Sequence, residues 1–381
     1  MKVRHFLNRF LFLATTQVVI HSVGASIAAT PFGTTSAGDK VTLLSLENAK
    51  GMKVAIIDYG ATVVSLHDPD KNSKFDDVVI GYDNMPDYQE RSHNFGSTVG
   101  RYASRITNAT FVIEGATYSL PPNSGPHSVH GGPVGFDKVM WRIVQKVDGD
   151  EPSLKLKYIS PDGDMGFPGE LTTFVTYSLT IDNALRIDYE ATTTKPTPIN
   201  LTHHSYFNLK GDGIGNVLDH KLQINASHTP SAPNSVPTGE IESIEGTPLD
   251  FRSPSLIGER INHPDFASRR GYNHYYILDG DSGNLVRAAT LSEATSGRTL
   301  EVWTTEPGLQ LYTGNWLSEE LVGKTGVPYQ QYGGVCLEPE HYPDSPNQPH
   351  FPNTILQPKE TFTSTTLYKF GARGITPVHE N

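Results

Sequence analysis

The chain has 381 residues and a formal net charge of −11, with 41 acidic against 30 basic residues. The basic residues form no cluster, so the sequence excludes a nucleic-acid partner, whose phosphates require a basic protein face. Because Cys336 is the only cysteine, no intramolecular disulfide can form, and stability must come from a sizeable apolar core.

Residues 1–29 differ from the rest of the chain. Three basic residues precede a short apolar run, FLFLATTQVVI, and small residues follow in VGASIAAT. This order is typical of a secretory signal peptide, and the run is shorter than the about 20 apolar residues that span a bilayer. We therefore expect residues 1–29 to be a signal peptide and the protein to be exported, to a periplasm or outside the cell. The alternative is a frayed amphipathic N-terminus. Three cleavage points fit equally well, after Ala25, Ala28 or Ala29.

The rest of the chain, 30–381, alternates apolar and polar residues in many short segments. In LRIDYEATT the apolar residues share one face, as a half-buried strand requires, and SLKLKYIS, TFVTYSLTI and TLEVWTTEP follow the same pattern. Gly- and Pro-rich turns such as PDGDMGFPG and LDGDSGN separate them. Helical signals are scarce, since SLIGERI and NWLSEEL allow a turn or two at most. The pattern predicts one large all-β domain, a sandwich or barrel, with no further membrane span.

Two loops carry polar residues that interrupt the strand pattern. In GRYASRITNATF, Arg101 and Arg105 offer rigid forks of donors suited to carboxylates or vicinal hydroxyls, although a surface ion pair explains them as well. In PNSGPHSVHGG, His130 precedes two glycines that let the backbone turn tightly and approach a ligand. A histidine in such a loop is more often a structural hydrogen-bonding residue, so each signal alone is weak.

The segment NLTHHSYFNL, 200–209, places His203 beside His204. If the segment is extended, side chains alternate, and the two imidazoles point to opposite faces. They then cannot bind one ion together, and the i, i+4 spacing of zinc-binding helices is absent. We therefore expect no metal site here.

The segment GGVCLEPEHYPDSPNQPHFP, 333–352, contains several acidic residues. Glu338 follows an apolar strand, and the next residue, Pro339, favours an extended backbone at Glu338. Burial of a carboxyl at such a place raises its pKa. Glu340, His341 and Asp344 crowd the same loop, so composition alone does not say which group matters.

Two further segments combine amides with aromatic rings. GLQLYTGNWL contains Gln310, and GYNHYYIL contains Asn273. Rings that pack on C–H surfaces, with amides, acids and arginines around hydroxyls, are what a sugar site needs. Each segment alone also fits an interface or a core, but their number in one chain favours the sugar hypothesis.

Taken together, the segments resemble the aldose 1-epimerase (galactose mutarotase) family. The likeness runs in order from about Leu43 to about Tyr368 and includes IIDYGATVVSL, GSTVGRYASRI, HSVHGG followed by GFDKVMW, NLTHHSYFNL, LDFR, GLQLYTGNWL and LEPEHYPDSPNQPHFP. The resemblance implies a large single-domain antiparallel β-sandwich. It also implies an isomerase that interconverts the α and β anomers of free aldoses of the glucose or galactose type, without metal or cofactor.

The resemblance implies a role for each matching residue. Glu338 is the general base and His204 the general acid, which remove the proton of the C1 hydroxyl and protonate the ring oxygen. The expected substrate-binding residues are Arg105, His130, Gln310 and Asn273, where Asn273 stands in place of an acidic residue usual in the family. The expected partner is a monosaccharide.

The sequence departs from the family pattern at further positions. Ser104 replaces a usual Asn, His203 stands where Asn is usual, and Pro339–Glu340 replaces Thr-Gln. These changes bear on substrate preference more than on reaction type. The alternatives are a hexose-phosphate epimerase that uses Arg101 and 269–270 for the phosphate, a sugar-binding or sensing module without activity, and a glycosidase, which needs two carboxylates.

Overall fold

The structure is a computed structural model that describes residues 27–91 and 93–372. Most of the predicted signal peptide, residues 1–26, lies outside the described residues. Within the described part, no helix is long and apolar enough to cross a membrane. The fold there is built almost entirely from antiparallel strands.

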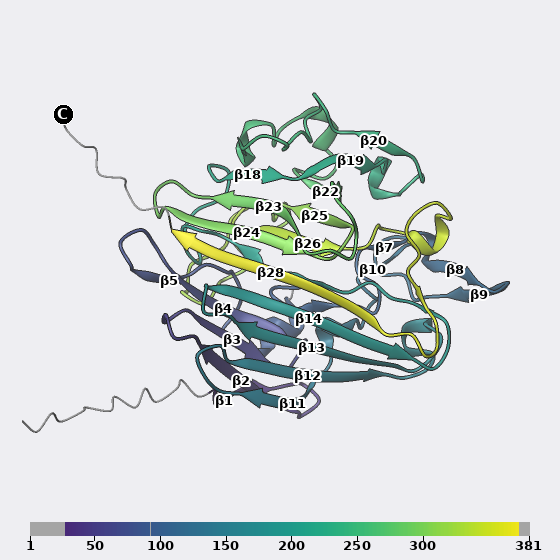
Figure 1. Ribbon diagram of the computed structural model, residues 1–381, viewed down its shortest axis with the longest axis horizontal. Coiled ribbons are helices and arrows are strands. Elements are labelled where there is room, and N and C mark those ends of the chain that lie inside the picture. The colour runs from purple at the N-terminus through teal and green to yellow at the C-terminus, as the bar shows by residue number, and fades with distance from the viewer. Residues whose placement is uncertain (1–26, 92, 373–381) are drawn as a thin grey trace, which may run out of the picture.

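The largest sheet has nine strands in the order β11-β12-β13-β14-β28-β24-β23-β18-β21 and forms the broad face of the molecule in Figure 1. Its strands, in that order, are Arg142–Val147, Ser153–Ser160, Leu171–Leu179, Ala184–Thr193, Phe362–Ala372, Arg298–Thr304, Val286–Ser292, Lys221–Ile224 and Ser255–Leu256. The predicted strands at 153–160, 173–181, 185–193 and 299–307 all lie in this sheet. In β14 the apolar residues Leu185, Ile187 and Tyr189 are buried, which confirms the predicted alternation.

Two further sheets complete the sandwich. The six-stranded sheet has the order β17-β26-β25-β22-β19-β20, with bounds Tyr206–Phe207, Val335–Glu340, Gly308–Tyr312, Asn273–Leu278, Ala226–Pro230 and Ile241–Ser243. The five-stranded sheet contains β1 to β5 in chain order, with bounds Ala28–Thr34, Lys40–Glu47, Lys53–Ile57, Thr62–Pro69 and Phe75–Asp77.

The remaining elements are short. Two-stranded pairs join β7 (Arg105–Ile106) to β10 (Ser128–Val129), β6 (Thr98–Val99) to β16 (Thr202–His203), β8 (Thr110–Ile113) to β9 (Ala116–Ser119), and β15 (Thr197–Pro198) to β27 (Ile355–Leu356). The described residues contain one short α-helix, α1, Met85–Glu90. Single 3-10 turns lie at Thr107–Ala109, Phe136–Lys138, Asp164–Gly166, Pro233–Ser235, Ile257–Glu259, Pro264–Phe266 and Ser345–Asn347. The predicted scarcity of helix is confirmed.

The main apolar core lies between the nine-stranded and six-stranded sheets. Leu337 of β26 belongs to the same buried cluster as Ile187 of β14 and Val302 of β24. The hydroxyl of Tyr368, on β28, donates to the carbonyl of Leu337 over 2.9 Å, so the two sheets face each other directly. The all-β, antiparallel sandwich predicted from the sequence is therefore confirmed.

Candidate active site

The floor of the candidate site is the outer face of three neighbouring strands, β26, β25 and β22. Side chains alternate along each strand, so Leu337 enters the core while Glu338 faces away from it. Glu338 is paired with Gln310, and Gln310 with Tyr275, which brings polar side chains from three strands side by side. The same alternation that builds the core therefore gathers the polar residues on the other face.

A cavity of about 740 Å³ lies over this face. Its walls contain all six residues predicted to form the site: Arg105, His130, His204, Asn273, Gln310 and Glu338. Clefts of this size, with aromatic walls and a few convergent polar groups, are typical of small-molecule sites. The structure thus brings together residues separated by more than 200 positions in the sequence.

His204 lies in the short link between β16 and β17. Its backbone is fixed on both sides, because its N–H donates to the carbonyl of Ser97 and its carbonyl accepts from Gly96. Gly96 has a φ of 65°, and a Cβ there would lie 1.9 Å from the Val63 carbonyl oxygen, so only glycine fits. This contact holds the imidazole over the strand that carries Glu338.

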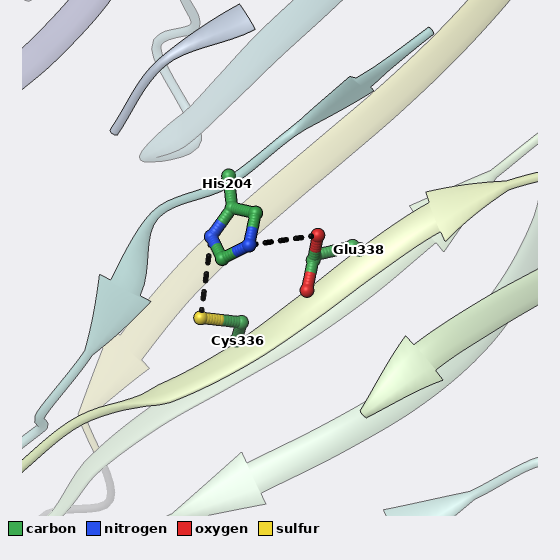
Figure 2. Close-up of side chains that lie close together, drawn as sticks. All are labelled: His204, Cys336 and Glu338. Atoms are coloured by element: carbon green, nitrogen blue, oxygen red, sulfur yellow. Dashed lines mark hydrogen bonds and ion pairs between the residues drawn. The ribbon is translucent and has the colours of Figure 1, made fainter. Parts of the chain in front are cut away.

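Figure 2 shows His204 between Glu338 and Cys336. Nε2 of His204 lies 3.3 Å from a carboxyl oxygen of Glu338, and Nδ1 lies 3.6 Å from the sulfur of Cys336. Burial, followed by the nearby Glu338, raises the pKa of the Cys336 thiol well above its usual range, so the sulfur keeps its hydrogen beside Nδ1. If the thiol donates to Nδ1, a neutral His204 carries its hydrogen on Nε2, toward Glu338.

Burial dominates the electrostatics of this pair. It raises the pKa of Glu338 to about 8 and lowers the pKa of His204 well below its usual range. Both side chains are almost fully buried, at 2% and 6% exposure. Two groups whose pKa values are moved in opposite senses within contact distance are typical of an acid–base site.

His130 is the second histidine of the cavity. Its ring stands edge-on to that of His204, with the centroids 5.5 Å apart. Its Nδ1 accepts a hydrogen bond from the backbone N–H of Ser104 over 3.2 Å, which leaves the hydrogen on Nε2. Burial, then Arg105 and Lys138, lowers its pKa to about 4, so at neutral pH it is an uncharged donor.

The other predicted binding residues are arranged in two groups. Gln310 donates to the side-chain oxygen of Asn273 over 2.5 Å, which orients both amides. Arg105, on β7, lines the cavity, and its guanidinium makes no hydrogen bond to another described residue. Its donors are therefore free for a ligand.

Several candidates from the sequence lie elsewhere. Arg101 is buried at 2% exposure, and its donors are used by neighbouring carbonyls and hydroxyls, which contradicts the surface ion pair. His203 points away from the cavity, as alternation predicts, and contacts Ser205 at 2.7 Å. His341 pairs with Glu306 at 2.5 Å, and Asp344 accepts from the backbone N–H of Thr107.

His204, Cys336 and Glu338 also each offer one ligand-type atom, and these atoms lie within 4.8 Å of one another. The sequence argument considered only the histidine pair and did not foresee this group. Coordination of a metal would require the thiolate of Cys336 and the carboxylate of Glu338, whereas burial raises the pKa of both groups in the metal-free protein.

Comparisons with known proteins agree with this geometry. A family model described as aldose 1-epimerase matches residues 42–369. The chain is 42% identical to a galactose mutarotase from Bos taurus over 322 residues, which is 84% of this chain and 91% of that protein. It is 39% identical to an aldose 1-epimerase from Escherichia coli over 337 residues, covering 87% and 96% of the two chains.

The chain belongs to the aldose 1-epimerase family. Solved structures of similar proteins confirm the fold of this family member. A galactose 1-epimerase from Lactobacillus acidophilus matches with a TM-score of 0.80 at 28% identity, over 92% of this chain and 100% of the other. An aldose epimerase homologue from C. elegans matches with a TM-score of 0.79 at 30% identity, over 87% and 98%. The interpretation of the chain as an isomerase is thereby confirmed.

Three residues in or beside the cavity of this aldose 1-epimerase family member had no role assigned to them in the sugar site from the sequence. Cys336 contacts His204, Glu340 lies beside Glu338, and Arg269 contacts His274 in the cavity wall. The alternation along β26 was a signal for the first two, because both share a face with Glu338. The sequence pointed to Arg269 only as a phosphate-binding candidate and not as a wall residue of a sugar site.

Proposed function

We propose that the protein interconverts the α and β anomers of free aldoses, with Glu338 as general base and His204 as general acid. The observation that carries this proposal is the buried contact of 3.3 Å between the two side chains at the floor of the cavity. The C1 hydroxyl and the ring oxygen are both attached to C1. An acid and a base that act on them together must therefore lie close to each other.

The reaction requires that Glu338 and His204 share one transferable proton between them. In the reactive form this proton is on His204: the Glu338 carboxylate removes the proton from the C1 hydroxyl while the His204 imidazolium gives its proton to the ring oxygen, and the hemiacetal C1–O bond breaks. The aldehyde then turns about the C1–C2 bond, and the reverse transfers close the ring with C1 inverted. Burial disfavours the charged form of both groups, so in the free protein the proton of the pair rests on Glu338, and it moves to His204 before the sugar ring opens.

The remaining wall residues supply hydrogen bonds to the sugar. His130 presents an Nε2–H donor near His204, which stabilises charge that develops on the ring oxygen or on a neighbouring hydroxyl. Arg105 offers a free guanidinium. The Gln310–Asn273 pair presents amides whose orientation is fixed before the sugar binds.

The rival activities have less support. Of the arginines considered for a phosphate, Arg101 is already bonded in the interior, Arg269 donates to Ser235 and Ala232, and Arg270 lies over the ring of Trp316. A glycosidase needs carboxyls that flank the scissile bond, whereas Glu338 and Glu340 project from the same face of one strand. A binding module without activity would not need an acid–base pair in contact.

Polarimetry of freshly dissolved α-D-glucose and α-D-galactose tests the proposal. We expect the wild type to exceed the buffer-catalysed rate on at least one aldose. Glu338→Gln should lower kcat about 10²- to 10⁴-fold, because the amide has nearly the same shape but cannot accept the proton. The proposal fails if the wild type does not accelerate mutarotation of any common aldose, or if Glu338→Gln keeps the full rate.

A chelator distinguishes this mechanism from a metal-dependent one. The group formed by His204, Cys336 and Glu338 makes the control necessary. We expect EDTA to leave the rate unchanged. Loss of activity on dialysis against EDTA, with recovery on addition of Zn²⁺, would instead assign these residues to a metal site.

We also propose that the protein is exported and cleaved after Ala25. The pattern of residues 1–29 supports export. Ile27 is buried at 7% exposure, its N–H donates to Asp148, and Ala28 already pairs in β1, so the two later cleavage points would remove part of the sheet. Mass spectrometry of the protein from the exported fraction of an expressing cell tests this. A mature chain beginning at Ser26 is expected, and a chain that keeps residue 1 would contradict export.

A further inference from the structure

Glu340 is a second carboxyl group at the floor of the cavity. It follows Glu338 by two residues on β26, so both side chains project from the same face of the strand. It lines the same cavity, its exposure is 0%, and neither carboxyl oxygen has a hydrogen-bond partner among the described residues. A buried polar group without a partner is rare in a native protein and requires an explanation.

The surroundings of Glu340 do not supply a counter-charge. On its own strand it faces Glu338, and a third carboxyl, Glu306, lies nearby before β25. The imidazole of His341 is occupied by Glu306 at 2.5 Å. The Tyr275 hydroxyl, from β22, donates to the backbone carbonyl of Glu340 and not to its carboxyl.

Only uncharged groups complete this environment. The hydroxyl of Ser104 lies close to the carboxyl and lines the cavity, and the phenols of Tyr102 and Tyr342 lie near Tyr275. No cation among the described residues forms an ion pair with Glu340. Three carboxyls crowded in a buried site cannot all ionise.

Glu340 therefore keeps its proton even when Glu338 is charged. Burial, then Glu338 and Glu306, raise its pKa well above the usual range, although Ser104 acts in the opposite sense. Glu338, in contrast, faces the imidazole of His204, which stabilises its charged form when His204 is protonated. A protonated carboxyl has one donor and one free acceptor, and both of these atoms lack a protein partner here.

We propose that Glu340 is a substrate-contacting residue that binds one hydroxyl of the sugar as a protonated acid, beside Ser104, and so determines which aldoses are accepted. The inference rests on the proposed function, because it assigns the ligand of the same cavity. A site built to bond a hydroxyl discriminates strongly against a sugar that lacks it, since the buried carboxyl is then left without a partner.

A panel of monodeoxy sugars tests this assignment. The kcat/KM of the best common aldose is compared with those of its 2-, 3-, 4- and 6-deoxy analogues, for wild type, Glu340→Met and Glu340→Gln. Methionine keeps the approximate size without hydrogen-bonding capacity, and glutamine keeps a donor and an acceptor. Asp68→Asn is the matched control, because Asp68 is also a buried carboxyl without hydrogen-bond partners but is not part of the cavity.

The wild type should prefer the parent sugar over one of the four analogues by about tenfold or more. Glu340→Met should lose this preference for that analogue alone, and Glu340→Gln and Asp68→Asn should keep it. The assignment is overturned if Glu340→Met discriminates against all four analogues as the wild type does. If Glu340→Met does not fold, Glu340→Asp decides in the same way, because it keeps the acid but withdraws it by one methylene.

Two measurements separate this assignment from the proposed function. Quenching of tryptophan fluorescence by the same sugars reports binding through Trp316 in the cavity wall, and it discriminates analogues even if mutarotation is absent. Infrared spectroscopy at neutral pH should show a protonated carboxylic-acid band that is weaker in Glu340→Gln than in the wild type, because Glu338 and Asp68, whose pKa values are also raised, still contribute to it. An unchanged band in Glu340→Gln would overturn the protonated state.

Discussion

The two faces of the six-stranded sheet use the same strands for opposite purposes. On the inner face, Leu337, Leu309 and Leu311 are completely buried against the nine-stranded sheet. On the outer face, their immediate neighbours Glu338 and Gln310 are partly or fully enclosed by the cavity walls. The side chains of the inner face are apolar and need only packing contacts. The outer face, in contrast, has polar atoms without hydrogen-bond partners in the protein, such as the carboxyl oxygens of Glu340. The difference indicates that stability and ligand recognition are separated by one residue along each strand.

The adjacent residues His203 and His204 point to opposite faces, and substitutions at these two positions should differ most in their effect on kcat. His204→Gln should lower kcat about 10²- to 10⁴-fold, because the amide keeps a donor near Nε2 but transfers no proton. His203→Gln should keep kcat within about threefold, because His203 contacts Ser205, Tyr177 and Tyr368 away from the cavity. Polarimetry with folded protein, checked by circular dichroism, measures both. Equal losses in the two variants would mean that the faces are not independent.

The second prediction concerns two neighbours on β26, one of which should affect stability and the other catalysis. Leu337→Ala should lower the free energy of unfolding by about 2–5 kcal/mol, the usual cost of a cavity in a packed core, while kcat of the folded enzyme stays within a few-fold. Glu338→Gln should do the opposite and leave the denaturation midpoint almost unchanged at acidic pH. Urea denaturation and polarimetry on the same samples check this, and a large loss of kcat in folded Leu337→Ala would contradict it.

Much of the fold, and part of the site, could be predicted from the sequence. Alternation along 185–193 predicted β14, and the same rule separated His203 from His204, because period-2 geometry is local. The family motifs pointed to Glu338 and His204 as a pair. Their 3.3 Å contact depends on the backbone of His204 being held by Gly96 and Ser97, which no local pattern encodes.

Other features depend on contacts between distant segments. The tautomer of His130 is set by the backbone N–H of Ser104, 26 residues away, and the orientation of Gln310 by Asn273. Arg101 resembled a surface residue in sequence because the carbonyls that bury it come from 160–169. Such contacts depend on the order of the strands in the folded chain, and they cannot be predicted from the sequence until that order is known.

The third prediction uses pH to separate the two faces. The pKa of Glu338 is about 4.5 in an unfolded chain and about 8 in the folded protein, so the folded state holds an extra proton between these values. Stability from this group is therefore present at low pH and is lost as pH rises from about 4.5 to about 8. Relative to Glu338→Gln, the wild type should lose at most about 1.4 kcal/mol per pH unit in this window. Urea denaturation of both proteins from pH 5 to pH 8 measures the difference, and a constant difference would contradict the raised pKa.

The smallest expected effect concerns the rim, where the outer face meets solvent. Trp316 lines the cavity but remains 52% exposed, and the guanidinium of Arg270 lies 5.0 Å from its ring centre. Trp316→Ala should raise KM by up to about fivefold, equivalent to about 1 kcal/mol of lost contact with the sugar's C–H surface, with kcat unchanged. Its unfolding free energy should stay within about 0.5 kcal/mol, because an exposed side chain contributes little to the core. Arg270→Gln is the matched control, since it removes the stacked cation and keeps the ring. A fall in kcat for Trp316→Ala would place the ring in the reaction itself, and the separation of recognition at the rim from chemistry at the floor would then be wrong.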